Sequence, residues 1–213
     1  IFKISIQIIP FINIEKIKYI VGSLTHLKNI IIDESFIHFA YEDKEFHLKS
    51  FVPFIENYRN ISIIKSMSKD FGVAGLRCGY AILPENRTEE LNSNGYLWNL
   101  NSIAEYFFRL YTRPDFYSKY ESVRKIYIKN TLNFICEIKK IKNIKVYPAK
   151  SNFVLIEVLN GLTADVVSME LLIKHGVYVR NCDDKIGLDG EFIRIAARSQ
   201  KENKIILCSL DKV

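Results

Sequence analysis

The sequence predicts an α/β protein, with a parallel sheet in its first half and a smaller α+β domain at its C-terminal end. Two short runs of branched apolar residues, 29–33 (NIIID) and 61–65 (ISIIK), are typical of buried strands. A segment with helical spacing of apolar residues separates them, and the order strand, helix, strand favours parallel pairing. After residue 142 the pattern changes to short strands alternating with helices, which indicates a second domain.

The first half contains four further predicted elements. Asn13 is expected to cap a helix through Ile17, Ile20 and Leu24. The apolar residues between positions 48 and 58 predict an amphipathic helix that joins the two strands. A helix is also expected over 98–111, and Pro114 suits the first turn of a long helix after it.

The second half begins with a predicted strand pair in VYPAKSNFVLIEV (146–158). A helix follows over ADVVSMELLIKH and stops at Gly176. VYVRNC and EFIRIAA read as short strands, and KENKIILCSL as a closing helix. We therefore divide the chain into a large-domain portion (1–114), a connecting helix (115–141) and a small C-terminal domain (142–213).

Composition excludes several classes of protein. The chain has 213 residues, 48% of them hydrophobic and 25% charged, as in a globular protein. Its four cysteines form no CxxC pair, so a disulfide framework or zinc site is not expected, and reduced thiols favour a cytoplasmic location. No uncharged apolar run reaches the length of a membrane span. The net charge of +6 is spread along the chain, without a stacking motif for nucleic acid.

Three charged residues stand at positions where chemistry is expected. Asp33 ends the first buried strand, Lys69 follows the end of the second, and Arg77 comes eight positions later. Ligands of open parallel sheets gather at the carboxyl ends of the strands, so Asp33 and Lys69 are expected to face one crevice. Taken alone, Asp33 could equally be a turn or helix cap, and Lys69 a solvated surface charge.

The string SMSKDFGVAGLRCGY (66–80) resembles the lysine segment of fold type I pyridoxal-phosphate (PLP) enzymes. Within that group it resembles the class I and II aminotransferases. The most similar branch is that of histidinol-phosphate aminotransferase and threonine-phosphate decarboxylase. DESF (33–36) resembles the branch's DEAY motif. YPAKSNFVL, GVYVRNC and IRIAAR resemble successive pieces of its C-terminal domain. The resemblance covers residues 29 to 213 and implies a partial parallel-sheet large domain with a small α+β domain.

The resemblance implies a role for each site residue in the large-domain portion. Lys69 would form a Schiff base with PLP and move the proton at the substrate's α-carbon. Asp33 would keep the pyridine nitrogen protonated, which makes the ring an electron sink. Arg77 would hold the phosphate, with hydroxyl donors from Ser66 and Ser68.

Two arginines of the C-terminal domain complete the implied site. Arg194 interrupts an apolar strand, where a charge is costly unless paired, and the resemblance makes it the clamp for the substrate carboxylate. Arg180 and Arg198 are candidates for a second anionic group, such as a substrate phosphate. The alternative for all three is a surface residue with its guanidinium in solvent.

The sequence departs from the family at two places. Phe36 stands where the family has a tyrosine that donates to the cofactor's 3′-oxygen. The region 5–13 (SIQIIPFIN) does not match the family's NPxNPTG-like stretch, and the N-terminal part of the family chain is missing. The chain could therefore be a fragment, a degenerate remnant, or one of two cooperating chains.

The resemblance therefore implies a PLP-dependent transaminase whose small-molecule substrates are an amino acid, phosphorylated amino acids included, and a keto acid, and which forms a homodimer. The alternatives are a PLP-dependent O-phospho-amino acid decarboxylase and a truncated, non-catalytic remnant.

Overall fold

The computed structural model describes residues 2–4, 12–95 and 100–213. The chain divides into two compact units, Ile1–Arg124 and Lys125–Val213. Residues 5–11, which include most of the stretch compared with the family's asparagine motif, and Trp98 at the start of the predicted helix 98–111 lie outside the described residues.

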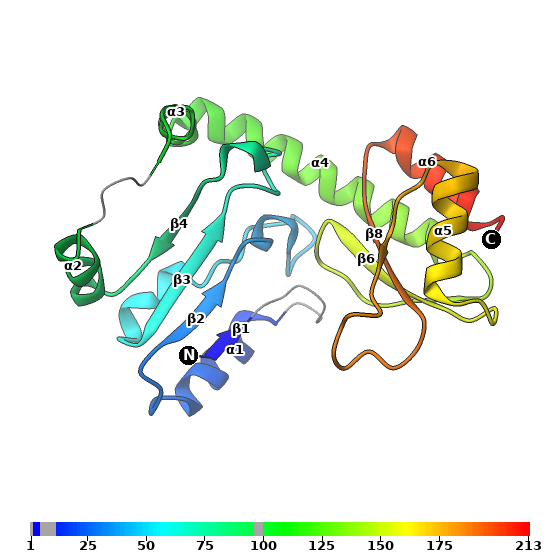
Figure 1. Cartoon of the computed structure of the whole chain (residues 1–213). Helices are drawn as coiled ribbons and strands as arrows, with labels where there is room; N and C mark the ends of the chain where they lie inside the picture. The colour runs from blue at the N-terminus through cyan, green and yellow to red at the C-terminus, as the bar shows by residue number, and fades with distance from the viewer. Residues whose placement is uncertain (1, 5–11, 96–99) are drawn as a thin grey trace. The chain divides into compact units, whose positions relative to one another are not determined.

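A four-stranded sheet organises the first unit (Figure 1). β1 (Phe2–Ile4), β2 (Ile30–Asp33) and β3 (Ile61–Ser66) pair in parallel, as the sequence predicts for β2 and β3. β4 (Gly79–Ile82) pairs antiparallel with β3. The carboxyl ends of β2 and β3 therefore lie at the same edge of the sheet, which we call the carboxyl edge.

The helix α1 (Ile14–Ser23) packs on one face of this sheet, and the side chains buried there are apolar. Asn13 caps α1 as expected, because its Oδ1 accepts from the Lys16 N–H at 2.9 Å. Ile17 and Val21 of α1 pack with a cluster of buried strand and loop residues, Ile30, Ile32, Phe51, Ile61 and Ile63.

The predicted helix over 48–58 is wrong in extent and type. The structure has two short 3₁₀ helices in this connection, η1 (Ile37–Phe39) and η2 (Val52–Asn57). Pro53 lacks an N–H and disfavours α conformation at Val52. The Phe51 N–H donates to Glu34 Oε1 at 2.6 Å. This side chain, distant in sequence, takes the place of the backbone carbonyl that would accept from Phe51 in an α-helix.

Helices complete the first unit beyond β4. α2 (Glu85–Ser93), which the sequence reading did not predict, follows β4, and α3 (Ser102–Tyr111) begins at Asn101, whose side chain caps it. A third 3₁₀ helix, η3 (Ala74–Leu76), lies between β3 and β4. α4 (Pro114–Ile138) begins at the expected proline, and its residues are shared between the two units.

The second unit is an antiparallel sheet with helices against it, in the order β5-β6-β8-β7. Its strands are β5 (Ile144–Val146), β6 (Phe153–Val158), β7 (Arg180–Asn181) and β8 (Phe192–Ala196). α5 (Ala164–His175) ends at Gly176, whose φ of 65° is the left-handed cap that the sequence predicts, and α6 (Gln200–Leu210) closes the chain. Phe134, Ile138, Val154, Ile156, Leu171 and Ile193 are among the buried core residues.

No helix in the described part of the chain is long and apolar enough to cross a membrane. All four cysteines are free thiols, with Cys78 and Cys182 buried and Cys136 and Cys208 exposed.

Candidate active site

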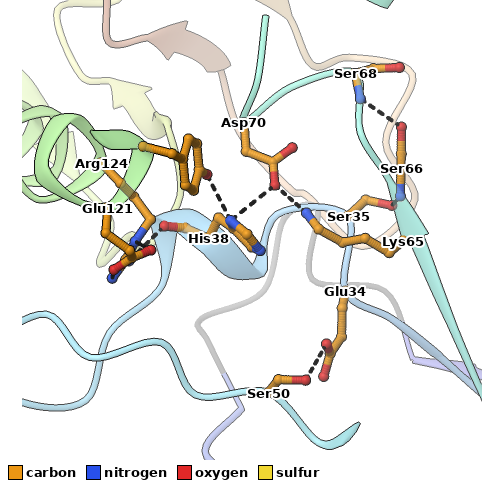
Figure 2. Close-up of polar contacts among 11 residues, drawn as sticks. Glu34, Ser35, His38, Ser50, Lys65, Ser66, Ser68, Asp70, Glu121 and Arg124 are labelled. Atoms are coloured by element: carbon orange, nitrogen blue, oxygen red, sulfur yellow. Dashed lines mark hydrogen bonds and ion pairs between the residues drawn. The ribbon is translucent and has the colours of Figure 1, made fainter. Parts of the chain in front are cut away.

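Asp33 and the loop that carries Lys69 meet at the carboxyl edge. Asp33 is 9% exposed, and its Oδ1 accepts from the Ser35 N–H at 3.0 Å. The Ser66 N–H donates to the Ser35 hydroxyl at 3.3 Å, which ties the end of β3 to the end of β2 (Figure 2). The parallel register therefore brings together the two strand ends from which the sequence predicts catalytic groups.

Lys69 lies in a turn of the loop 67–78, which connects β3 to β4. The loop is closed at its base because the Met67 N–H donates to the Cys78 carbonyl at 3.2 Å, and Met67 is fully buried. The Lys69 residue is exposed, and its carbonyl accepts from the Gly72 N–H at 3.3 Å. In the described part of the chain, the Lys69 amine has neither a hydrogen bond nor an ion pair.

Arg77 lies at the other end of the same loop in a strained conformation. Its φ of 53° and ψ of 45° place it in the left-handed region, which non-glycine residues seldom adopt. The guanidinium is exposed and donates to the Ala74 carbonyl at 3.0 Å. Strain of this kind gathers at ligand sites, where surrounding structure imposes it.

Ser66 and Ser68 lie on the first residues of this connection. Ser66 Oγ accepts from the Ser68 N–H at 3.3 Å, so the hydrogen of the Ser66 hydroxyl remains able to donate to an anion (Figure 2). Both serines are half-buried.

The backbone at Gly79, where the loop 67–78 enters β4, lies very close to the backbone of β3. A Cβ added at Gly79 would lie 2.5 Å from the Lys65 carbonyl oxygen and 3.3 Å from the Ser66 Cα. Position 79 therefore requires glycine for β4 to pair with β3 at this distance. The Asn101 side chain holds the loop from the other side, because its Nδ2 donates to the Leu76 carbonyl at 3.0 Å.

In the second unit, Arg180 and Arg194 lie directly opposite each other on the paired strands β7 and β8. The Arg194 guanidinium lies over the Phe153 ring, 4.6 Å from its centroid, and Arg180 donates to Asp184 at 2.7 Å. Like charges directly across a strand pair repel, so an anion between them would stabilise this arrangement. Arg198, the weaker candidate, instead pairs with Glu202 at 3.0 Å and lines a pocket of about 470 Å³ beside Tyr178 and Ile205.

Sequence reasoning missed a group of buried polar residues next to Lys69. Lys65, Asp70, His38 and Tyr120, which we call the Lys65 cluster, contact one another (Figure 2). Burial lowers the pKa of His38 to about 3, so its imidazole is neutral at pH 7. One feature of the sequence could have revealed this group. Lys65 comes two residues after Ile63 in an apolar strand, so its side chain points to the same buried face as that of Ile63.

Comparison with known proteins then identifies the family. The sequence profile of aminotransferase class I and II matches residues 14–210. The chain belongs to this family. The expected fold type I architecture is confirmed, and pyridoxal phosphate is the cofactor that the family and its decarboxylase members imply.

The individual relatives of this class I and II chain divide by reaction. L-serine phosphate decarboxylase Cj1436c of Campylobacter jejuni is 50% identical over 200 residues, which are 94% of this chain and 51% of that protein. A decarboxylase structure from Sulfurospirillum multivorans matches with a TM-score of 0.94 and 41% identity, covering 99% of this chain and 60% of that one. The histidinol-phosphate aminotransferase of Clostridium acetobutylicum matches with a TM-score of 0.84 and 31% identity, covering 99% and 62%.

The prediction of a transaminase is therefore wrong. The chain is markedly more similar to the decarboxylases than to the aminotransferase, although all share one fold. The resemblance of the lysine segment does not distinguish the two reactions, because the decarboxylases and aminotransferases of this family share one fold and one cofactor. The chain spans about half the length of the curated relative it matches.

The residues at the carboxyl edge fit pyridoxal phosphate. The cofactor presents an aldehyde, a ring nitrogen and a phosphate dianion. The edge offers an unpartnered amine on Lys69 among the described residues, a nearly buried carboxylate on Asp33, and a guanidinium on Arg77 held in a strained conformation. Phe36, at the N-terminal cap of η1, carries no hydroxyl and supplies none to the cofactor.

Proposed function

We propose that this chain provides the lysine-bearing part of a PLP-dependent O-phospho-L-amino acid decarboxylase, with L-serine phosphate as substrate. The observation that carries the proposal is the 50% identity to an L-serine phosphate decarboxylase over 94% of the chain. The geometry of the carboxyl edge supports the cofactor part of the proposal, since Asp33 ends β2 and Lys69 follows the end of the adjacent parallel strand β3. The reaction converts L-serine phosphate to phosphoethanolamine and carbon dioxide, with one proton added at the α-carbon.

The residues of the first unit hold the cofactor and handle the proton. The chemistry that pyridoxal phosphate supplies when bound is an electron sink for the pair left when the bond from Cα to the carboxylate breaks. Asp33 would hold the ring nitrogen of the cofactor by accepting its proton in a hydrogen bond. Lys69 would hold the cofactor covalently and would supply the proton to the α-carbon of the substrate. Arg77, Ser66 and Ser68 bind the phosphate.

The residues of the second unit select the substrate. L-serine phosphate carries two anionic groups, a carboxylate and a phosphate. Arg194, which lies half-buried over Phe153, binds the carboxylate until it leaves. Arg180 binds the substrate phosphate, and its link to Asp184 uses one of five donors. A homodimer in the cytoplasm remains a prediction for the whole protein.

The covalent step is tested first. The purified chain is mixed with pyridoxal phosphate, reduced with borohydride, and digested, and mass spectrometry locates the attached group. We expect attachment at Lys69 and its loss in Lys69→Ala. Lys119→Ala, which removes an exposed lysine of α4, serves as the matched control and should retain attachment at Lys69. Equal labelling of many surface lysines in the parent and in Lys69→Ala would refute the assignment.

The reaction is tested with L-serine phosphate labelled at the carboxyl carbon. We expect release of labelled carbon dioxide in equimolar amounts with phosphoethanolamine, and at least about a hundredfold less in Lys69→Ala. L-serine, which lacks the phosphate, should react far more slowly because Arg180 then has no anion to bind. Formation of a keto acid without carbon dioxide would contradict the proposal.

A further inference from the structure

The polar contacts of the Lys65 cluster include one residue of the turn that carries Lys69, because Asp70 directly follows Lys69 in the chain. The Lys65 amine donates to Asp70 Oδ2, and His38 Nδ1 lies 3.6 Å from the same oxygen. His38 Nδ1 also lies 2.7 Å from the Tyr120 hydroxyl. The cluster thus joins the end of β3, the 3₁₀ helix η1, the turn at 68–70 and the helix α4.

Three of the four side chains of the Lys65 cluster are almost completely buried. The side chains of Lys65 and Asp70 are 1% and 0% exposed, and that of His38 is 4% exposed. Burial lowers the pKa of Lys65, while the charge of Asp70 opposes that shift. A buried ion pair of this kind adds little net stability compared with an apolar pair of similar volume, because each charge has lost its hydration. Its contribution to structure is directional, since it fixes where each partner points.

The residue after Asp70 anchors the same turn by packing. The Phe71 ring stacks on Tyr120 with centroids 4.2 Å apart, and it meets Phe107 and Tyr111 edge to face at 5.5 and 5.3 Å. α4 is itself held to the connection beyond β2, because buried Arg124 donates to the His38 carbonyl at 2.9 Å and pairs with Glu121 (Figure 2).

Lys69 and Asp70 are adjacent residues with opposite environments. The Asp70 side chain is fully enclosed, whereas Lys69 is exposed and its amine is unpartnered among the described residues. In a tight turn, fixing one side chain toward the interior fixes the direction in which its neighbour projects. The Lys69 carbonyl to Gly72 N–H bond holds the backbone of this turn.

We propose that Asp70 is a positioning residue for Lys69: its carboxylate, bound by Lys65 in the Lys65 cluster, holds the turn 68–72 so that the Lys69 amine projects from the carboxyl edge. The proposal depends on the proposed function only for the task of Lys69. The Lys65–Asp70 pair touches no substrate and acts through the backbone of the turn.

The test uses variants that remove the pair in two ways. Asp70→Asn removes the negative charge and leaves Lys65 buried. The double variant Lys65→Met with Asp70→Leu removes both charges and leaves none uncompensated, so it should fold even if Asp70→Asn does not. Glu191→Gln is the control, because it changes a carboxylate that accepts from the Ala164 N–H at 2.6 Å in the second unit, away from the turn.

Two readouts separate positioning from stability. The first is amide hydrogen exchange of the peptide covering 67–72, measured without cofactor. The second is the ratio of pyridoxal phosphate attachment at Lys69 to attachment at exposed Lys119 in the same molecule. We expect exchange of 67–72 to rise at least about tenfold, and the ratio to fall at least about tenfold, in Asp70→Asn and in the double variant. Glu191→Gln should change neither by more than about twofold.

The outcomes are distinguishable. Parent-like exchange and attachment in the double variant would overturn the proposal, because the pair would then be only a packing feature. Failure of both variants to fold would also overturn it, since it would make the pair a requirement of the fold itself. If the parent shows no preference for Lys69 yet the exchange of 67–72 rises as expected, the proposed function fails and the positioning role stands.

Discussion

Replacing Gly79 with alanine is the substitution whose effect the structure specifies most closely. The added Cβ would lie 2.5 Å from the Lys65 carbonyl oxygen, about 0.5 Å nearer than a Cβ atom tolerates. Because the contact is with backbone, β4 must move away from β3. A shift of that size would lengthen the 3.2 Å bond from Met67 N to the Cys78 carbonyl to about 3.7 Å, beyond hydrogen-bond range.

The free energy of unfolding should fall accordingly. Overpacking costs about 1–3 kcal/mol and the lost hydrogen bond about 1 kcal/mol, so Gly79→Ala should destabilise the chain by about 2–4 kcal/mol. Thermal unfolding followed by circular dichroism should show a fall in Tm of about 4–16 °C. Gly75→Ala is the matched control, because a Cβ there meets nothing within 4 Å and its backbone is not left-handed. Equal Tm values for the two variants would refute the reasoning.

Three other predictions follow from the described contacts. Arg194→Gln should lower kcat/KM for L-serine phosphate by about 10–100-fold through loss of a charged hydrogen bond, while Arg198→Gln changes it by less than about threefold; a steady-state assay measures both. The folded pKa of His38, lowered by burial to about 3, lies below its ordinary 6.5, so stability should fall by about 1 kcal/mol per pH unit from pH 6 to 4. Urea titrations should show that slope reduced in His38→Gln. Gly176→Ala should cost about 1 kcal/mol by the same titration, since φ is 65° and no clash occurs.

Local signals predicted most of the elements that carry the candidate site. The strands ending at Asp33 and Ser66 were visible because short isoleucine-rich runs favour buried strands. Asn13 and Gly176 were readable as helix ends because capping depends on neighbours within one turn. The same holds for Pro114, which needs no distant partner to begin a helix.

Contacts between segments distant in sequence defeated the local reading. Glu34 reaches across to the Ser50 hydroxyl and the Phe51 N–H, and this tether, with Pro53, replaces the amphipathic helix that apolar spacing predicted. No local pattern marks His38, because its partner Tyr120 lies on a helix 82 positions later. The choice between transamination and decarboxylation was equally beyond reach, since both reactions use the same cofactor-binding groups.

The strand order has a consequence for which parts of the first unit open most readily. β2 and β3 are each hydrogen-bonded on both sides in the described sheet, whereas β1 and β4 each have one paired neighbour there. Fraying begins with strands that are paired on one side only. Thermal opening of β1 or β4 therefore leaves the hydrogen bonds between β2, which ends at Asp33, and β3, which precedes Lys69, intact. Reactive groups that must meet one small molecule to within fractions of an ångström are thereby supplied by the slowest-opening part of the sheet.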